Sequence, residues 1–227
     1  MQPYLEALAD LFYPQWCVSC EARSSDVLCH ACFDALPWIC PPTCARCGVP
    51  TTVETPACEA CRTVDFAFGS ARAPLRYEGV GKEIVHALKY RGYTPVVEKV
   101  AAPMMAQAVA GLGSFDVVVP VPLHRSRLRK RGFNQAGLLA RALAGRIKAP
   151  LSDTLEVVRK TRDQVELSAA ERRANVAGAF SATTRLRGRI LLVDDVFTTG
   201  ATTDACANAL LRAGATEVHA LTLCRTC

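Results

Sequence analysis

One segment near the end of the chain constrains the fold most. Residues 190–202 join four apolar residues to two adjacent aspartates and then to a turn of small and hydroxyl residues. The apolar residues predict a buried parallel strand over 190–193, and the turn predicts entry into a helix over 203–212. Asp194 and Asp195 then lie at the carboxyl end of the strand, where open α/β sheets bind ligands. The segment therefore predicts an α/β fold with a ligand site at one sheet edge.

The turn after the aspartates predicts a phosphate site. Its small residues let backbone N–H groups approach an anion at the amino end of a helix, and its hydroxyl groups can add hydrogen bonds. The residues concerned are Thr198, Thr199, Gly200, Ala201 and Thr202. The alternative is a plain strand, turn and capped helix, in which the acids serve only as caps and turn formers. The length of the run favours a ribose 5-phosphate, with the acids holding its hydroxyls.

The size and polarity of the chain limit its class. Its 227 residues allow a full core and a small appended module. Charged residues interrupt every apolar run before the roughly 18 residues that a membrane-spanning helix needs, so we expect no membrane insertion. Residues 1–16 contain Glu6 and Asp10 and lack a basic leader and a cleavage site. We expect a short helix there rather than a secretion signal, and a cytoplasmic protein.

The net charge of +6 is unevenly divided along the chain. Residues 1–66 hold 3 Lys/Arg against 8 Asp/Glu, a balance of −5, whereas residues 67–227 hold 24 against 13, a balance of +11. Anionic small ligands and nucleic acid are both candidate partners of the basic part. Because the composition changes near residue 66, we predict an N-terminal module over 1–66 and a second domain over 67–227.

Eight of the twelve cysteines form four Cys-x-x-Cys pairs. A chain without an export signal meets a reducing compartment, which argues against a disulfide scaffold. Each pair can give two thiolates to one tetrahedral cation, so four pairs predict two structural Zn²⁺ sites that supply much of the module's folding free energy. The expected ligands are Cys17, Cys20, Cys29, Cys32, Cys44, Cys47, Cys58 and Cys61.

The pairing of the four motifs stays open at this point. Sequential pairing joins neighbouring motifs and encloses loops of 8 and 10 residues, which suit a zinc knuckle or ribbon. Interleaved pairing would join the first motif to the third. We favour sequential pairing; His30 and Cys40 lie close enough in the sequence to substitute as ligands. Cys206 and Cys224 are expected to be small buried hydrophobes.

The remaining patterns alternate between strands and helices, which predicts a mostly parallel sheet with helices on both faces. Expected strands cover residues 66–77, 115–119, 155–158, 190–193 and 217–223, and expected helices cover 80–90, 94–112, 134–147, 169–176 and 203–212. In the helix over 80–90, apolar positions 84, 85, 87 and 88 face a core. That pattern leaves Lys82, Glu83, Lys89 and Arg91 free.

Two polar segments follow strand ends. Residues 125–131 carry five basic side chains, which alone would indicate a solvated loop or a polyanion patch. Between a parallel strand and a helix, the same loop can present amides and cations to pyrophosphate. The candidates for nucleic-acid contact are Arg125, Arg127, Arg129, Lys130 and Arg131, with Tyr90 or Phe133 available to stack on bases.

Residues 159–168 predict a mobile lid that closes over a ligand and excludes water. Arg159 and Lys160 are its candidate catalytic cations, which would stabilise charge on a departing pyrophosphate. The alternative is an ordinary exposed connection.

The segment over 190–202 resembles the phosphoribosyl pyrophosphate (PRPP) signature of type I phosphoribosyltransferases. The resemblance implies that Asp194 and Asp195 hold the ribose hydroxyls, as catalytic and PRPP-binding residues, and that residues 198–202 wrap the 5-phosphate. Phe197 departs from the smaller aliphatic residue usual in that family. The turn at Val121, Pro122 and Leu123 resembles the pyrophosphate loop of amidophosphoribosyltransferases.

Over nearly its whole length the chain resembles the ComF family. The motifs that carry this resemblance are the double Cys-x-x-Cys module, Leu88-Lys-Tyr-Arg-Gly92, Val119-Pro-Val-Pro122, Arg131-Gly-Phe-Asn-Gln135, Thr161, Gln164, Leu167, Arg172, Asn175 and the run over 193–202. The resemblance implies a type I phosphoribosyltransferase fold behind a zinc module, Mg²⁺ with PRPP, and a link to competence, the uptake of DNA in natural transformation.

Three functions stay open on the sequence. The first is a phosphoribosyltransferase in which an unidentified acceptor displaces pyrophosphate from PRPP. The second is a non-catalytic, PRPP-responsive protein that binds single-stranded DNA through its basic residues. The third is an adaptor whose acidic zinc module docks a protein of the DNA-uptake machinery.

Overall fold

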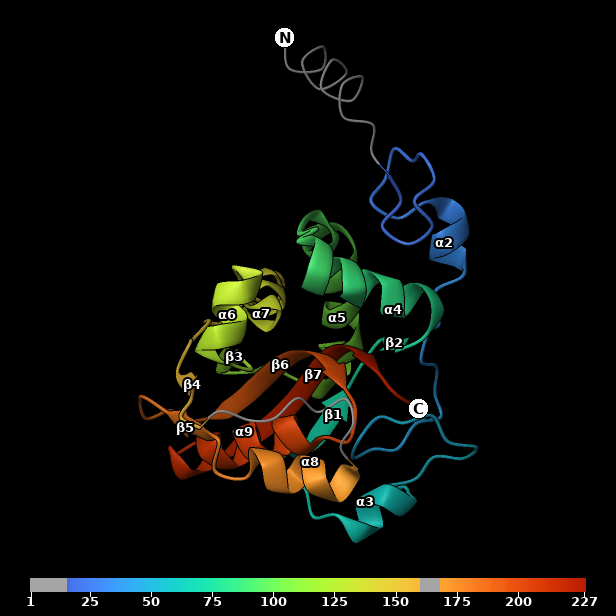
Figure 1. The fold of residues 1–227 in the computed structure, drawn as a ribbon. Helices are drawn as coiled ribbons and strands as arrows, with labels where there is room; N and C mark the ends of the chain where they lie inside the picture. The colour runs from blue at the N-terminus through green and yellow to red at the C-terminus, as the bar shows by residue number, and fades with distance from the viewer. Residues whose placement is uncertain (1–15, 160–167) are drawn as a thin grey trace.

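The computed structural model describes residues 16–159 and 168–227 (Figure 1). The helix expected before Trp16 and residues 160–167 of the expected lid, Lys160 included, lie outside these ranges.

A five-stranded parallel sheet forms the centre of the fold. Its order is β1-β7-β6-β3, with β2 also paired to β7. The strands are β1 (Ser70–Arg72), β2 (Leu75–Arg76), β3 (Val117–Pro120), β6 (Arg189–Phe197) and β7 (Glu217–Arg225). In register, Val118 of β3 pairs with Leu191, which pairs with His219 of β7. The α/β class and the mostly parallel sheet are confirmed.

Helices connect the strands. They are α2 (His30–Asp34), α3 (Glu59–Thr63), α4 (Gly79–His86), α5 (Ala102–Val109), α6 (Arg125–Arg131), α7 (Gln135–Ile147), α8 (Ala169–Val176) and α9 (Ala201–Arg212), with π-helical turns η1 (Ala87–Arg91) and η2 (Val97–Ala101) and a 3₁₀ turn η3 (Ala110–Leu112). Every helix of the described ranges is too short or too polar to cross a lipid bilayer.

The sheet is covered on both faces because side chains alternate along its strands. Leu191 and Val193 belong to a hydrophobic cluster with residues of α4, α5 and α7. Ile190 and Leu192 belong to a second cluster with residues of α9. Figure 1 shows α4, α5 and α7 on one side of the sheet and α8 and α9 on the other.

Several elements differ from the sequence-based expectation. The strand expected over 66–77 is divided into β1 and β2, because Pro74 has no N–H to donate to the ladder. The strand expected at 155–158 is β4 (Leu155–Val157), which pairs antiparallel with β5 (Phe180–Ala182) in a separate two-stranded sheet. Glu156 at its centre is exposed, which a central parallel strand with two buried faces would not allow.

The two halves of the cysteine-rich region pack on opposite faces of the sheet. Cys17, Val18 and Leu28 join the cluster that contains α4, α5 and α7. Cys44 and Cys47 instead join the cluster that contains α9. In Figure 1 the first half, beside α2, and the second half, beside α3, are widely separated. We call residues 16–36 the first ribbon and residues 43–64 the second ribbon.

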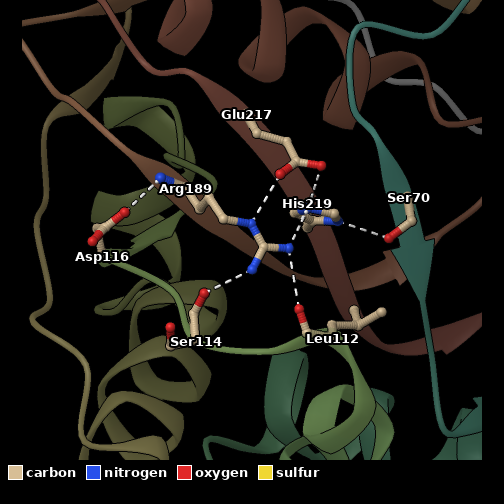
Figure 2. Close-up of polar contacts among 7 residues, drawn as sticks. All are labelled: Ser70, Leu112, Ser114, Asp116, Arg189, Glu217 and His219. Carbon is tan, nitrogen blue, oxygen red and sulfur yellow. Dashed lines mark hydrogen bonds and ion pairs between the residues drawn. The ribbon is translucent and has the colours of Figure 1, made fainter.

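A polar network ties the amino ends of the central strands together (Figure 2). Arg189 Nε donates to Glu217 Oε2 at 2.9 Å, and Glu217 Oε1 lies 2.8 Å from His219 Nε2. His219 Nδ1 is 2.8 Å from Ser70 Oγ on β1. Asp116, just before β3, accepts the Arg189 N–H at 2.7 Å. Ser70 and His219 are buried, so this network links four strands rather than offering a nucleophile to a substrate.

Candidate functional site

The candidate site lies at the carboxyl edge of the sheet. The pairing of β3 with β6 ends at Pro120 and Val193. The Val121 N–H donates to the Val193 carbonyl at 2.8 Å, so the segment after β3 starts beside the aspartates of β6. Asn134 Nδ2 donates to the Val121 carbonyl at 3.0 Å and holds this segment from the start of α7. The structure therefore brings Val121, the first residue of the segment over 121–123, next to the part of β6 that carries Asp194.

The two aspartates lie within β6 rather than after it. Strand β6 continues to Phe197 because β7 extends to Arg225 and supplies backbone partners over the added residues. Neighbouring residues of a strand point to opposite faces. Asp195 accordingly meets Lys89 of η1, whose Nζ lies 3.0 Å from Asp195 Oδ2. Asp194 faces α9, where burial and then the Asp194 carboxyl raise the pKa of Cys206.

Burial and charge make this edge electrostatically unusual. Burial, and then the neighbouring Asp195 carboxylate, raise the pKa of Asp194 to about 8. Burial would lower the pKa of Lys89, but the Asp195 carboxylate outweighs it, so the pKa of Lys89 is raised and its ammonium stays charged. Such shifted carboxyl groups concentrate at functional sites. A ligand that brings hydroxyl donors would favour ionised Asp194.

The expectation that Lys89 and Arg91 are free was wrong. The Lys89 side chain is 19% exposed and bound to Asp195, and Arg91 Nη1 donates to Glu21 Oε1 of the first ribbon at 2.6 Å. The prediction assumed a regular α-helix through residue 90. A π-helical turn holds more residues per turn, so it rotates the side chains that follow, and helical periodicity does not locate them.

The turn after β6 leads into the amino end of helix α9. Gly200 has φ of +77° and caps the twelve-residue helix α9. A Cβ there would lie 2.7 Å from Phe197 Cζ and 2.9 Å from Phe66 Cε1, so this position requires glycine. Thr198 is exposed, and the Ala201 N–H donates to Thr199 Oγ1 at 3.4 Å at the amino end of α9, where helix N–H groups favour an anion. Arg225 stacks over the Phe197 ring at 5.1 Å, which accounts for the large residue at position 197.

The basic residues over 125–131 form helix α6 rather than the expected loop. His124 Nδ1 accepts the Ser126 N–H at 3.2 Å as the N-cap, and Gly132 ends the helix with φ of +84°. Arg and Lys are good helix formers, and a glycine after basic residues is typical of a helix C-terminus. The sequence pattern therefore could have predicted this helix. Arg131 lies over the ring of Tyr90 at 5.6 Å. Tyr90 is 72% exposed, so a basic helix and an open aromatic face lie together.

Of the two expected lid cations, Arg159 lies within the residues that the structure describes. Its Nη2 donates to the carbonyls of Asn175 and Ala177, at 2.9 and 2.8 Å, at the end of α8. Its role as a lid cation, like that of Lys160, stays a prediction.

The eight paired cysteines form two clusters, and sequential pairing is confirmed. In each cluster the sulfur atoms lie within 4.8 Å of one another; the groups are Cys17, Cys20, Cys29 and Cys32, and Cys44, Cys47, Cys58 and Cys61. His30 and Cys40 are outside both clusters. Cys206 and Cys224 are buried, as expected.

The thiols of both clusters suit a structural zinc ion. The Cys29 N–H donates to Cys17 Sγ at 3.4 Å, and the Cys58 N–H donates to Cys44 Sγ at 3.2 Å. Burial would raise the pKa of Cys17 and of Cys44, but backbone N–H groups outweigh it and lower each pKa to about 6. Backbone donors thus favour the thiolate, which is the form that binds metal.

Comparisons with known proteins agree with this architecture. Residues 8–62 match the double zinc ribbon domain family, and residues 94–226 match the phosphoribosyl transferase domain family. The chain is 34% identical to DNA utilization protein YhgH of Salmonella typhimurium over 190 residues, 81% of this chain and 84% of that protein. It is 28% identical to Competence protein ComFC of Bacillus subtilis over 215 residues, 90% of this chain and 86% of that protein. A solved glutamine PRPP amidotransferase from B. subtilis overlaps 55% of this chain and 25% of its own, at 28% identity and a TM-score of 0.38.

Proposed function

This chain belongs to the ComF family, which joins a double zinc ribbon to a phosphoribosyltransferase domain, and from that membership we propose that it binds PRPP with Mg²⁺ and transfers the phosphoribosyl group. The observation that carries the proposal is the sheet edge at which Asp194 and Asp195 meet the Gly200 turn and the start of α9. The proposal leaves the acceptor unassigned.

Each part of PRPP has residues suited to it. The 5-phosphate would lie on residues 198–202, where the amino end of α9 offers N–H donors. The ribose hydroxyls would bind at the strand segment that carries Asp194 and Asp195, and the pyrophosphate would lie along Val121–Leu123. Mg²⁺ would neutralise part of the pyrophosphate charge.

The reaction we propose is a displacement at the anomeric carbon. The bond from that carbon to the pyrophosphate oxygen breaks, a bond to the acceptor nucleophile forms, and pyrophosphate leaves with the electron pair. Positive charge grows on the sugar in the transition state, and the carboxylates at the strand end stabilise it. Arg159 and Lys160 would stabilise the leaving group when the segment over 159–168 closes.

Pyrophosphate release tests the proposal. The zinc-loaded protein is incubated with PRPP, Mg²⁺ and a panel of nucleobases, amines and oligonucleotides, beside Asp194→Asn and Asp195→Asn. The matched control is Asp153→Asn, an exposed acid away from the strand end. We expect acceptor-dependent release in wild type and the control, and its loss in both site variants. Tight PRPP binding without release from any acceptor would contradict transfer and leave binding alone.

A second function is favoured by helix α6. Arg131 lies over the exposed ring of Tyr90, and Arg125, Arg129 and Lys130 of the same helix are exposed, an arrangement suited to tracking a phosphate backbone while bases stack. We propose that this surface binds single-stranded DNA, in keeping with the similarity to DNA utilization protein YhgH. Replacing Arg129 and Lys130 with Gln should weaken binding and reduce the salt slope by about 1 to 2. Fluorescence anisotropy at several salt concentrations measures both.

We propose that each cysteine cluster binds one Zn²⁺, that the zinc-binding part covers residues 1–66, and that the protein acts in the cytoplasm. Elemental analysis of the purified protein should give two zinc ions per chain.

The acidic balance of residues 1–66, together with the exposed Phe33 and Trp38 rings, suits this part of the chain to docking a protein partner of the DNA-uptake machinery.

A further inference from the structure

The π-helical turn η1 contacts both the candidate site and the first ribbon. Lys89 points toward β6, and its Nζ lies 3.0 Å from Asp195 Oδ2. Two residues later, Arg91 leaves the turn toward the ribbon, where Nη1 donates to Glu21 Oε1 at 2.6 Å and Nη2 donates to the Val18 carbonyl at 2.7 Å. One turn of chain therefore joins a ribose-binding carboxylate to a metal-binding module.

The ion pair between Lys89 and Asp195 is largely shielded from solvent. The side chains of Lys89 and Asp195 are 19% and 6% exposed. Among the described residues, no aligned hydrogen-bond donor reaches Asp195 Oδ2, although the Lys89 charge compensates it. The carboxylate thus has a cation that fixes its position and capacity left for a hydroxyl donor of a ligand.

The contact with the first ribbon depends on its cysteine cluster. Val18 lies between Cys17 and Cys20, and Glu21 directly follows Cys20 in a backbone conformation with φ of +59°. The ribbon buries Val18 and Leu28 in the cluster that contains α4, and a metal bound by Cys17 and Cys20 would fix the loop that carries both partners of Arg91. The second ribbon packs on the other face of the sheet, in the cluster that contains α9.

We propose that Lys89 is a positioning residue for the ribose site and that the first ribbon holds it in place through Arg91. The inference rests on the proposed binding of PRPP, and it adds a regulatory link, because the state of the first ribbon then sets PRPP affinity. The π-helical geometry supports it, since such turns are rare and often mark functional sites. It directs Lys89 and Arg91, only two residues apart, to two different partners.

The test is calorimetric titration of the zinc-loaded full chain with PRPP and Mg²⁺. We expect Lys89→Met to weaken binding by about tenfold or more, because Asp195 loses the cation that orients it. Lys89→Arg should recover most of the loss. Arg91→Met should weaken binding by about threefold, as a variant that acts through another residue. Thermal melts confirm that each variant is folded at the temperature of the titration.

Two matched controls come from the same chain. Lys82→Met removes an exposed lysine from α4, the helix that leads into η1. Arg146→Met removes an arginine that, like Arg91, binds a backbone carbonyl and a carboxylate of a neighbouring element, here those of Glu98. Both controls should bind PRPP within about twofold of wild type.

A double-mutant cycle separates coupling from general damage. If the ribbon acts through Lys89, Arg91→Met adds little to the loss already caused by Lys89→Met. Full additivity, or a Lys89→Met variant that binds within twofold of wild type, overturns the inference while the proposed function stands. A wild-type protein that gives no heat with PRPP overturns the proposed function itself, and the inference with it.

Discussion

At the scale of single residues, the carboxyl group of Asp194 is a candidate for binding a ligand and also lowers the stability of the folded protein near neutral pH. Its pKa is raised from 3.8 to about 8, first by burial and then by Asp195. Between about pH 4 and pH 8 the folded protein therefore holds a proton that the unfolded chain releases. The contribution of Asp194 to the free energy of unfolding is therefore fully present below about pH 4 and is lost as the pH rises toward 8.

Asp194→Asn should consequently stabilise the protein at pH 7.5, by about 1 to 3 kcal/mol, while abolishing PRPP binding. Thermal melts of wild type and variant from pH 5 to 8.5 measure the difference. It should grow as pH rises, whereas the exposed Asp153→Asn should show no such trend. A variant that melts below wild type at pH 7.5 would contradict a raised pKa of Asp194.

Gly200→Ala gives a second prediction at this scale. The new Cβ would meet the rings of Phe197 and Phe66 at a position with φ of +77°. We expect a loss of about 1 to 3 kcal/mol and weaker PRPP binding, measured by denaturant unfolding and calorimetry. Gly145→Ala is the control: it lies in α7 with open space around it, and alanine should be neutral or stabilising there. Equal stability of Gly200→Ala and wild type would argue against the packed turn.

At the scale of elements, the two ends of β6 and β7 have different roles. The carboxyl ends carry the candidate site, whereas the amino ends are joined by the network around Arg189. That guanidinium also donates to the carbonyls of Ser114 and Leu112, before β3.

Arg189→Met should lower the free energy of unfolding by about 2 to 4 kcal/mol, because several partners lose a charged donor at once. PRPP affinity, measured well below the melting temperature, should stay near that of wild type. A large loss of affinity in a folded variant would show that the two sheet edges are coupled. Arg146→Met serves as the comparison, since the Arg146 side chain binds the backbone carbonyl and the carboxylate of Glu98.

The sequence predicted elements whose pattern is local and missed those set by tertiary partners. Helix α8 was placed at its observed bounds, because Ser168 and Glu171 form a capping box that the sequence displays. Strand β6 was found but made too short, since its added residues depend on a partner strand far along the chain.

The same distinction holds for the site. The aspartates and the Gly200 turn were predicted because they are contiguous, and the cysteine pairing because its loops are short. Lys89 was missed because its partner is a hundred residues away and a π-helical turn directs it there. Nothing in the spacing of residues 84–88 signals that turn.

At the scale of the whole molecule, each ribbon is part of a shared core. Arg91 bonds to the first ribbon, and Arg225 of β7 donates to the Cys47 carbonyl of the second. Each ribbon also buries side chains in a cluster that includes the sheet.

Removal of zinc should therefore destabilise the whole protein rather than two appendages. We expect chelation to lower the melting temperature in one cooperative transition and to weaken PRPP binding. Calorimetric scans with and without chelator, followed by zinc restoration, measure this. Two separate transitions, with the later one unchanged by chelator, would indicate ribbons that fold independently.

The aromatic wall behind Gly200 has a practical consequence for dissecting this protein. Phe66 closes one side of the Gly200 turn, and the N–H of Ala67 donates to Asp204 Oδ1 on α9 at 2.6 Å. Cutting the chain after residue 66 would therefore remove an aromatic ring that packs against the Gly200 turn of the candidate site. A truncated protein made to study the proposed sugar chemistry must retain Phe66.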